Sequence, residues 1–127
     1  MAGAPAITII GAGFGGIGMA ARLLRAGFGD VTVFEQADRV GGVWAANSYP
    51  GAACDIPAAL YSFSFAPKPD WSRRYPPQEE IRDYLEDTAR RFGVLPLIRF
   101  ATEVTHAGFD EAASDWVLTL GDGGTRP

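Results

Sequence analysis

AITIIGAGFGGIGMAARLLRAGFGDVTVFE, residues 6–35, is the stretch that decides the fold of this chain. Residues 6–10 form a short apolar run rich in β-branched side chains, which predicts a buried strand, and residues 31–35 predict a second one. Between them, apolar residues recur with helical spacing up to Gly27, a residue typical of helix ends. The residues expected on the buried face of this helix are Ile17, Ala20, Ala21 and Leu24. A strand, a helix and a strand in this order form a βαβ unit with parallel strands and a right-handed crossover.

The turn between the first strand and the helix carries the motif G-x-G-x-x-G as GAGFGG, residues 11–16. Gly11 permits the tight turn, Gly13 lets the backbone approach a diphosphate, and Gly16 lets the helix pack against the strand. The amino end of the helix then offers unpaired N–H groups and a partial positive charge to phosphate groups. The motif therefore predicts a dinucleotide site.

Glu35 ends the second strand, about twenty residues after the motif, where a dinucleotide-binding fold places an acid. A carboxylate there accepts hydrogen bonds from ribose hydroxyls and repels a 2′-phosphate, which favours NAD or FAD over NADP. Gly41 and Gly42 follow shortly afterwards and would let a second loop approach the nucleotide, as FAD-binding proteins commonly require. The alternatives are a glycine-rich turn with a solvent-facing glutamate and, for the glycine pair, an ordinary turn.

The rest of the chain divides into an irregular part and a regular part. Residues 41–77 lack periodicity and are rich in Gly, Pro and aromatic residues, which favours a functional loop. Residues 77–93 predict an amphipathic helix with acidic residues in its first turn and basic residues in its last. Two strands are expected within residues 98–110 and 115–124, and the final GDGGTRP is expected to be turn material.

Composition narrows the classes of function. The 127 residues fit one domain, and a formal net charge of −4 argues against a nucleic-acid partner. A single cysteine excludes an intrachain disulfide, and no Cys/His cluster offers a metal site. The first residues lack the features of a secretory signal, and no apolar run approaches the roughly 20 residues needed to span a bilayer. These features predict a cytoplasmic protein without a membrane partner.

The stretch YPGAACDIP, residues 49–57, places that cysteine beside an aspartate. Cys54 is expected to be a small packed side chain rather than a nucleophile, because no histidine base lies nearby in sequence. Asp55 either forms a turn before Ile56 and Pro57 or carries a function.

From about Ile7 to about Leu120 the chain resembles the N-terminal part of flavin-containing Baeyer–Villiger monooxygenases of the phenylacetone and cyclohexanone types. The most specific elements are GGVW (41–44), YPGAACD (49–55) and YSFSF (61–65). The resemblance implies an α/β fold: a Rossmann-like FAD-binding domain of the two-dinucleotide-binding-domain flavoprotein type. A parallel sheet with a C-terminal β-meander is expected, cut short at the end of the chain.

The resemblance also implies contacts to both halves of FAD. Glu35 would hold the adenosine ribose, and the backbone of Val104 would lie near the adenine. The residues expected to cradle the diphosphate are Phe14, Gly15 and Gly16. The residues expected on the flavin side are Gly42, Val43, Trp44, Asp55 and Tyr61.

The reaction implied by the resemblance uses NADPH, O₂ and a small ketone. NADPH reduces FAD, O₂ forms a C4a-peroxyflavin, and the peroxide attacks the ketone to give an ester or lactone. Asp55 is the expected catalytic residue. In the family the corresponding carboxylate pairs with an arginine near the peroxyflavin, and so positions and charge-balances that cation.

Two positions depart from the family pattern: Val43 replaces a common threonine, and Ala53 replaces an arginine that could meet the nicotinamide. The second glycine motif, which binds NADPH, the FxGxxxHxxxW fingerprint and a segment for the catalytic arginine are absent from the 127 residues. Residues 1–127 are therefore expected to be a partial N-terminal FAD-binding domain without an NADPH-binding domain. This domain alone should not oxidise ketones. Ketone-dependent consumption of NADPH by the purified 127-residue chain would refute that expectation. The alternatives are another FAD-dependent monooxygenase or reductase, such as an N-hydroxylating enzyme, and a non-catalytic dinucleotide-binding module.

Overall fold

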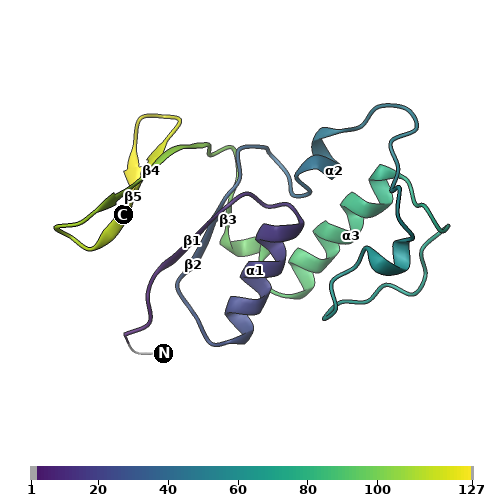
Figure 1. The fold of residues 1–127 in the computed structure, drawn as a ribbon, viewed down its shortest axis with the longest axis horizontal. Helices are drawn as coiled ribbons and strands as arrows, with labels where there is room; N and C mark the ends of the chain where they lie inside the picture. The colour runs from purple at the N-terminus through teal and green to yellow at the C-terminus, as the bar shows by residue number, and fades with distance from the viewer. Residues whose placement is uncertain (1–2, 127) are drawn as a thin grey trace.

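Figure 1 shows the parallel sheet that the first stretch of sequence predicts. The structure is a computed structural model and describes residues 3–126. Within these residues the sheet has three strands in the order β1-β2-β3, namely β1 (Ile7–Ile10), β2 (Val31–Phe34) and β3 (Ile98–Arg99). Helix α1 (Phe14–Arg25) connects β1 to β2, which run parallel with Ile7 opposite Val31. The predicted βαβ unit is confirmed, but β1, which was expected to be buried, alternates between half-buried and exposed residues.

An apolar core lies where this sheet meets α1 and a second helix, α3 (Gln78–Arg91). The two helices lie side by side in Figure 1. On α1 the residues Ile17, Ala20 and Ala21 are buried as expected, whereas Leu24 is only half-buried. Short alanine side chains on α1 leave room for the larger side chains of α3 in the same core.

Helix α3 occupies most of the segment predicted as a helix. Its buried residues are Gln78, Ile81, Tyr84, Leu85, Thr88 and Ala89. Acidic residues stand in its first turn and basic residues in its last, so both ends interact favourably with the helix dipole. Phe92 lies just beyond the helix and is half-buried.

The segment 41–77 is largely irregular, as predicted, but it contains two short helical elements. They are the one-turn helix α2 (Val43–Ala46) and the 3₁₀-helix η1 (Ala58–Leu60). A helix of one turn is too short to show apolar periodicity, so no sequence pattern predicts it.

The segment 98–110 was expected to be extended, and the structure divides it between two sheets. After the 3₁₀-helix η2 (Leu95–Leu97), β3 pairs with β2, and β4 (Val104–Asp110) begins a separate antiparallel sheet. Between them the chain turns at Ala101, whose φ is 51°, and the N–H groups of Ala101 and Thr102 donate to the carbonyls of Ala37 and Glu35. These bonds tie the break to the loop that follows β2.

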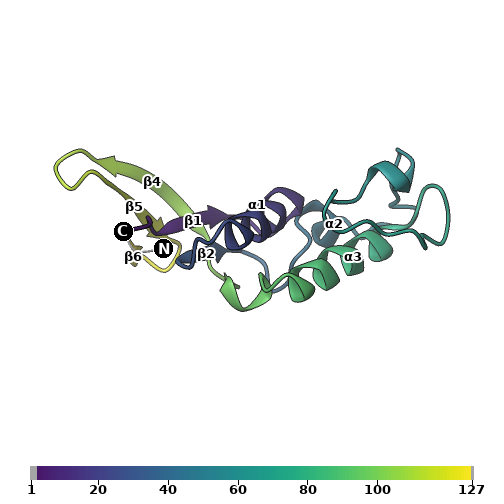
Figure 2. The same ribbon diagram turned by 90° about the horizontal axis from the view of Figure 1, so that it is seen from below.

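The antiparallel sheet is the predicted β-meander. β4 pairs with β5 (Asp115–Leu120), which pairs with β6 (Thr125–Arg126), so a short strand replaces part of the turn expected at the end of the chain. Figure 2 shows that the β4–β5 hairpin and the 41–77 segment lie at opposite ends of the molecule. Within residues 3–126 no helix is long and apolar enough to cross a membrane.

Candidate functional site

A cleft of about 540 Å³ opens at the carboxyl ends of β1 and β2. Ligands of open α/β sheets bind at this edge. Six of the residues predicted to contact a cofactor line it, from four separate segments of the chain: Gly11, Gly13, Glu35, Gly42, Val43 and Val104. Another hollow, of about 610 Å³ beside α3, is lined by charged residues of both signs, prolines and Tyr84, and contains none of the predicted site residues. The first cleft is therefore the candidate site.

Sequence reasoning missed the other residues that line this cleft. They are Ile10, Phe34, Gln36, Ala37, Asp38, Arg39, Ala45, Ala46, Thr102 and Glu103. Half of them adjoin a predicted residue in the sequence, and that proximity was the only available signal. Thr102 and Glu103 reach the cleft because β3 pairs with β2 and the chain then turns back beside it.

The packing around the cleft requires glycine at two places. A Cβ on Gly16 would lie 1.8 Å from the carbonyl oxygen of Gly11, so α1 packs against the end of β1 only without a side chain there. Gly42 has a φ of 57°, and its Cβ would lie 3.1 Å from the Cα of Gly13. The second glycine loop thus rests directly on the first, backbone against backbone. At Gly13 and Gly42 the two loops therefore present main-chain atoms to the cleft.

Glu35 forms one wall of the cleft and is only 6% exposed. One carboxylate oxygen accepts the Ala12 N–H at 2.9 Å and the other accepts the Ala37 N–H at 2.8 Å. These bonds compensate the burial of the charge and fix the direction of the side chain. Each oxygen has capacity for a further donor. The alternative of a solvent-facing glutamate is therefore excluded.

Three predicted cofactor residues gather in an aromatic cluster rather than in the cleft wall. Phe14 packs edge-on against Tyr61 with ring centroids 4.8 Å apart, and Trp44 meets Tyr61 at 5.6 Å. The Trp44 indole N–H donates to the Tyr61 hydroxyl at 3.0 Å. The first turn of α1, with Phe14, Gly15 and Gly16, holds no acidic side chain, so its N–H groups keep their attraction for an anion.

Asp55 and Cys54 lie in the loop before η1, outside the cleft lining. Cys54 is 3% exposed, as predicted for a packed thiol, and its N–H donates to the Pro76 carbonyl at 3.0 Å. Asp55 is exposed and has no ion pair within residues 3–126. In the same described part of the chain, no group of His, Cys, Asp and Glu side chains is arranged to hold a metal ion.

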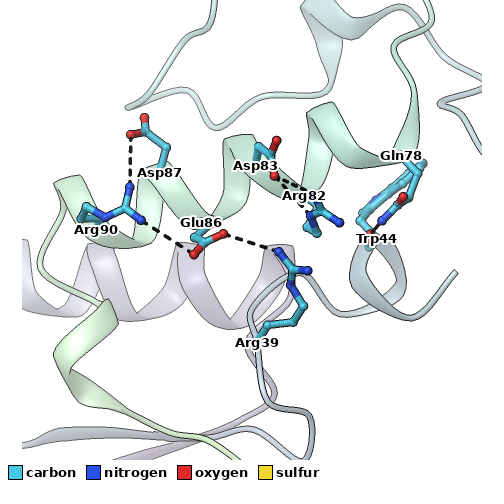
Figure 3. Close-up of polar contacts among 8 residues, drawn as sticks. All are labelled: Arg39, Trp44, Gln78, Arg82, Asp83, Glu86, Asp87 and Arg90. Carbon is cyan, nitrogen blue, oxygen red and sulfur yellow. Dashed lines mark hydrogen bonds and ion pairs between the residues drawn. The ribbon is translucent and has the colours of Figure 1, made fainter. Parts of the chain in front are cut away.

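Figure 3 shows how a charged network joins the cleft to α3. Arg39, which lines the cleft, pairs with Glu86 at 3.7 Å, and Glu86 pairs with Arg90 at 3.7 Å. The side chains of these residues are about half exposed, and such surface pairs contribute about 0–1 kcal/mol each. The network therefore orients Arg39 more than it stabilises the fold.

Comparison with known proteins places these features in a family. Residues 9–85 match the model of the NAD(P)-binding Rossmann-like domain. A Baeyer–Villiger monooxygenase of Streptomyces coelicolor is 52% identical over 112 residues, which are 88% of this chain and 22% of that protein.

Solved structures agree with this match. A steroid monooxygenase bound to NADP superposes with a TM-score of 0.88 at 40% identity, over 94% of this chain and 24% of that one. The enzyme OTEMO in complex with FAD and NADP gives a TM-score of 0.88 at 32% identity, over 96% and 24%. The Rossmann-like fold and the similarity to Baeyer–Villiger monooxygenases predicted from sequence are confirmed. The chain spans about a fifth to a quarter of the length of these proteins.

Proposed function

We propose, for a chain that belongs to the family of NAD(P)-binding Rossmann-like domains, that the cleft binds FAD. We further propose that the chain is the FAD-binding portion of an NADPH-using, Baeyer–Villiger-like flavin monooxygenase. The observation that carries this proposal is the convergence of two glycine loops and a buried carboxylate at the carboxyl ends of parallel strands. Similarity to a Baeyer–Villiger monooxygenase and to an enzyme complexed with FAD and NADP supports it.

The residues of the cleft fit a dinucleotide. Gly13 and Gly42 meet through main-chain atoms, and a Cβ on either would occupy the space between the loops. An extended diphosphate can therefore approach the backbone, while the first turn of α1 supplies N–H groups and a positive dipole end. The cleft volume of about 540 Å³ lies within the range of cofactor pockets.

The adenosine end of FAD is assigned to Glu35 and Val104. Glu35 would accept hydrogen bonds from the ribose hydroxyls with the lone pairs that Ala12 and Ala37 leave free. A 2′-phosphate would meet a buried anion there, which disfavours NADP in this cleft. Val104 begins β4 at the cleft edge and would face the adenine.

The flavin end of FAD is assigned to Gly42 in the second glycine loop and to three residues beyond it, Val43, Trp44 and Tyr61. Bound FAD would accept a hydride from NADPH and activate O₂ for insertion beside a ketone carbonyl. Asp55 is exposed, so its carboxylate is available to orient a cation at the reacting group. A cytoplasmic location is also proposed, because one cysteine in 127 residues is unlike the disulfide-dense composition of small secreted domains.

Titration of the purified 127-residue chain with FAD and with NADP⁺ tests the assignment of the cleft. Flavin fluorescence and absorption should report binding of FAD, and NADP⁺ should compete poorly. Glu35→Gln should weaken FAD binding by roughly 10- to 100-fold, because it removes a charged acceptor from the ribose. Glu111→Gln, at an exposed turn outside the cleft, is the matched control and should leave FAD binding unchanged. Tighter binding of NADP⁺ than of FAD would overturn the proposal. A chain that binds neither cofactor would overturn it as well.

A further inference from the structure

We infer that Gln78 is a positioning residue that holds the GGVW turn in place for the flavin half of FAD. This inference rests on the proposed function for its ligand, whereas the contacts that carry it belong to the protein alone. Gln78 is the first residue of α3 and lies outside the cleft lining. It is a polar side chain only 4% exposed, and its burial requires hydrogen-bond partners.

The partners of Gln78 lie in two different loops. Its side-chain amide donates to the carbonyl of Trp44 in α2, and its backbone N–H donates to the carbonyl of Ala52 at 2.9 Å. Figure 3 shows Gln78 beside Trp44, where α3 meets α2. One residue thus connects α3 both to the GGVW turn and to the stretch that leads to Asp55.

Helix α2 depends on such outside contacts because it has only one turn. A helix of this length is not stable by itself, and its last carbonyls have no partner within the helix. Asn47 caps the Val43 carbonyl with both its backbone N–H and its side-chain amide, each at 3.0 Å. The next carbonyl, that of Trp44, is the one that Gln78 caps.

The other end of α2 is fixed to the first glycine loop. Gly41 donates its N–H to the Ala12 carbonyl at 2.9 Å, and Gly42 rests on Gly13. The GGVW turn is therefore held between the diphosphate loop on one side and Gln78 on the other. Loss of the Gln78 amide would release the Trp44 side while the Gly41 side stays attached.

This asymmetry predicts which half of the cofactor responds. Among the described residues, the hydrogen bonds of Gln78 go to Trp44 and Ala52 and not to Glu35 or the amino end of α1, so binding of ADP should not depend on them. FAD extends beyond the diphosphate toward the GGVW turn and should depend on it. A merely structural role would weaken both ligands together.

The test compares Gln78→Met with the wild-type chain. Methionine keeps the length of the side chain and the backbone bond to Ala52 but removes the donor to Trp44. Amide hydrogen exchange of the ligand-free chain should become about tenfold faster at Ala46 and Asn47, whose N–H groups bond within α2. FAD affinity should fall about tenfold, the effect of one net hydrogen bond, while ADP affinity changes by less than twofold.

Thr88→Val is the matched control, because Thr88 is a fully buried polar residue of α3 whose hydroxyl donates to the Tyr84 carbonyl of the same helix. It should leave exchange in α2 and the FAD-to-ADP affinity ratio unchanged. Unaltered exchange at Ala46 and Asn47 in Gln78→Met would overturn the inference, as would an equal loss of FAD and ADP binding. A wild-type chain that binds no FAD would refute the proposed function instead, and the exchange measurement would still decide the role of Gln78.

Discussion

Replacing Gly16 by alanine has two opposite effects on the free energy of unfolding, and the size of each can be estimated. Alanine in a helix is favoured over glycine by about 1 kcal/mol, so helix propensity alone predicts a more stable chain. The new Cβ, however, would lie 1.8 Å from the Gly11 carbonyl oxygen and 2.9 Å from its carbonyl carbon. Those atoms are main chain and cannot rotate away. Overpacking of this kind costs about 1–3 kcal/mol, and contact with backbone places the cost at the upper end. We expect a net loss of about 2 kcal/mol.

Urea denaturation followed by far-ultraviolet circular dichroism measures this loss. With a slope of about 1–3 kcal/mol per molar urea, the midpoint of Gly16→Ala should fall by about 1 M. Gly15→Ala is the control, because a Cβ on Gly15 would have no atom within 4 Å and its side chain would face solvent. Its midpoint should be equal to that of the wild type or slightly higher. A Gly16→Ala chain as stable as the wild type would show that α1 does not pack this closely against the Gly11 carbonyl at the end of β1.

Two further results follow from single side chains. Cys54 is 3% exposed, so a thiol reagent should modify it slowly in the native chain and rapidly in denaturant; equal rates would contradict its packed position. The pKa of Asp70 lies below its ordinary value because Lys68 donates a hydrogen bond to it and lies 3.1 Å away as a cation. Lys68→Met should therefore raise the Asp70 pKa in an NMR titration. The small stability that the pair supplies is present above the ordinary pKa and is lost as pH falls through the lowered one.

Local sequence patterns predicted the elements that large apolar faces define. The strand, helix and strand of residues 6–35 appear where expected, because an apolar run and a helical spacing of apolar residues are each set by neighbouring positions in the chain. Helix α3 follows for the same reason. α2 and the separation of β3 from β4 were not predicted. α2 is too short for a period, and the break before β4 depends on hydrogen bonds to residues far back in the sequence.

The candidate site was predictable in its parts but not in its assembly. Gly11, Gly13 and Glu35 were identified because the chemistry of a diphosphate and a ribose requires those residue types at that spacing. The structure adds that Glu35 is held by two backbone N–H groups. Gln78 carried no signal as a site residue, since a glutamine at the start of an amphipathic helix is ordinary in sequence.

The sequence by itself determined that a phosphate-binding turn joins a strand to a helix and that an acid closes the next strand. Both depend on residues near one another in the chain, where backbone freedom and side-chain charge act locally. Only the tertiary structure decided that Gly42 rests on Gly13, that Val104 reaches the same cleft, and that Gln78 caps Trp44. These contacts join distant segments, and their geometry depends on how the core orients α1 and α3 against the sheet.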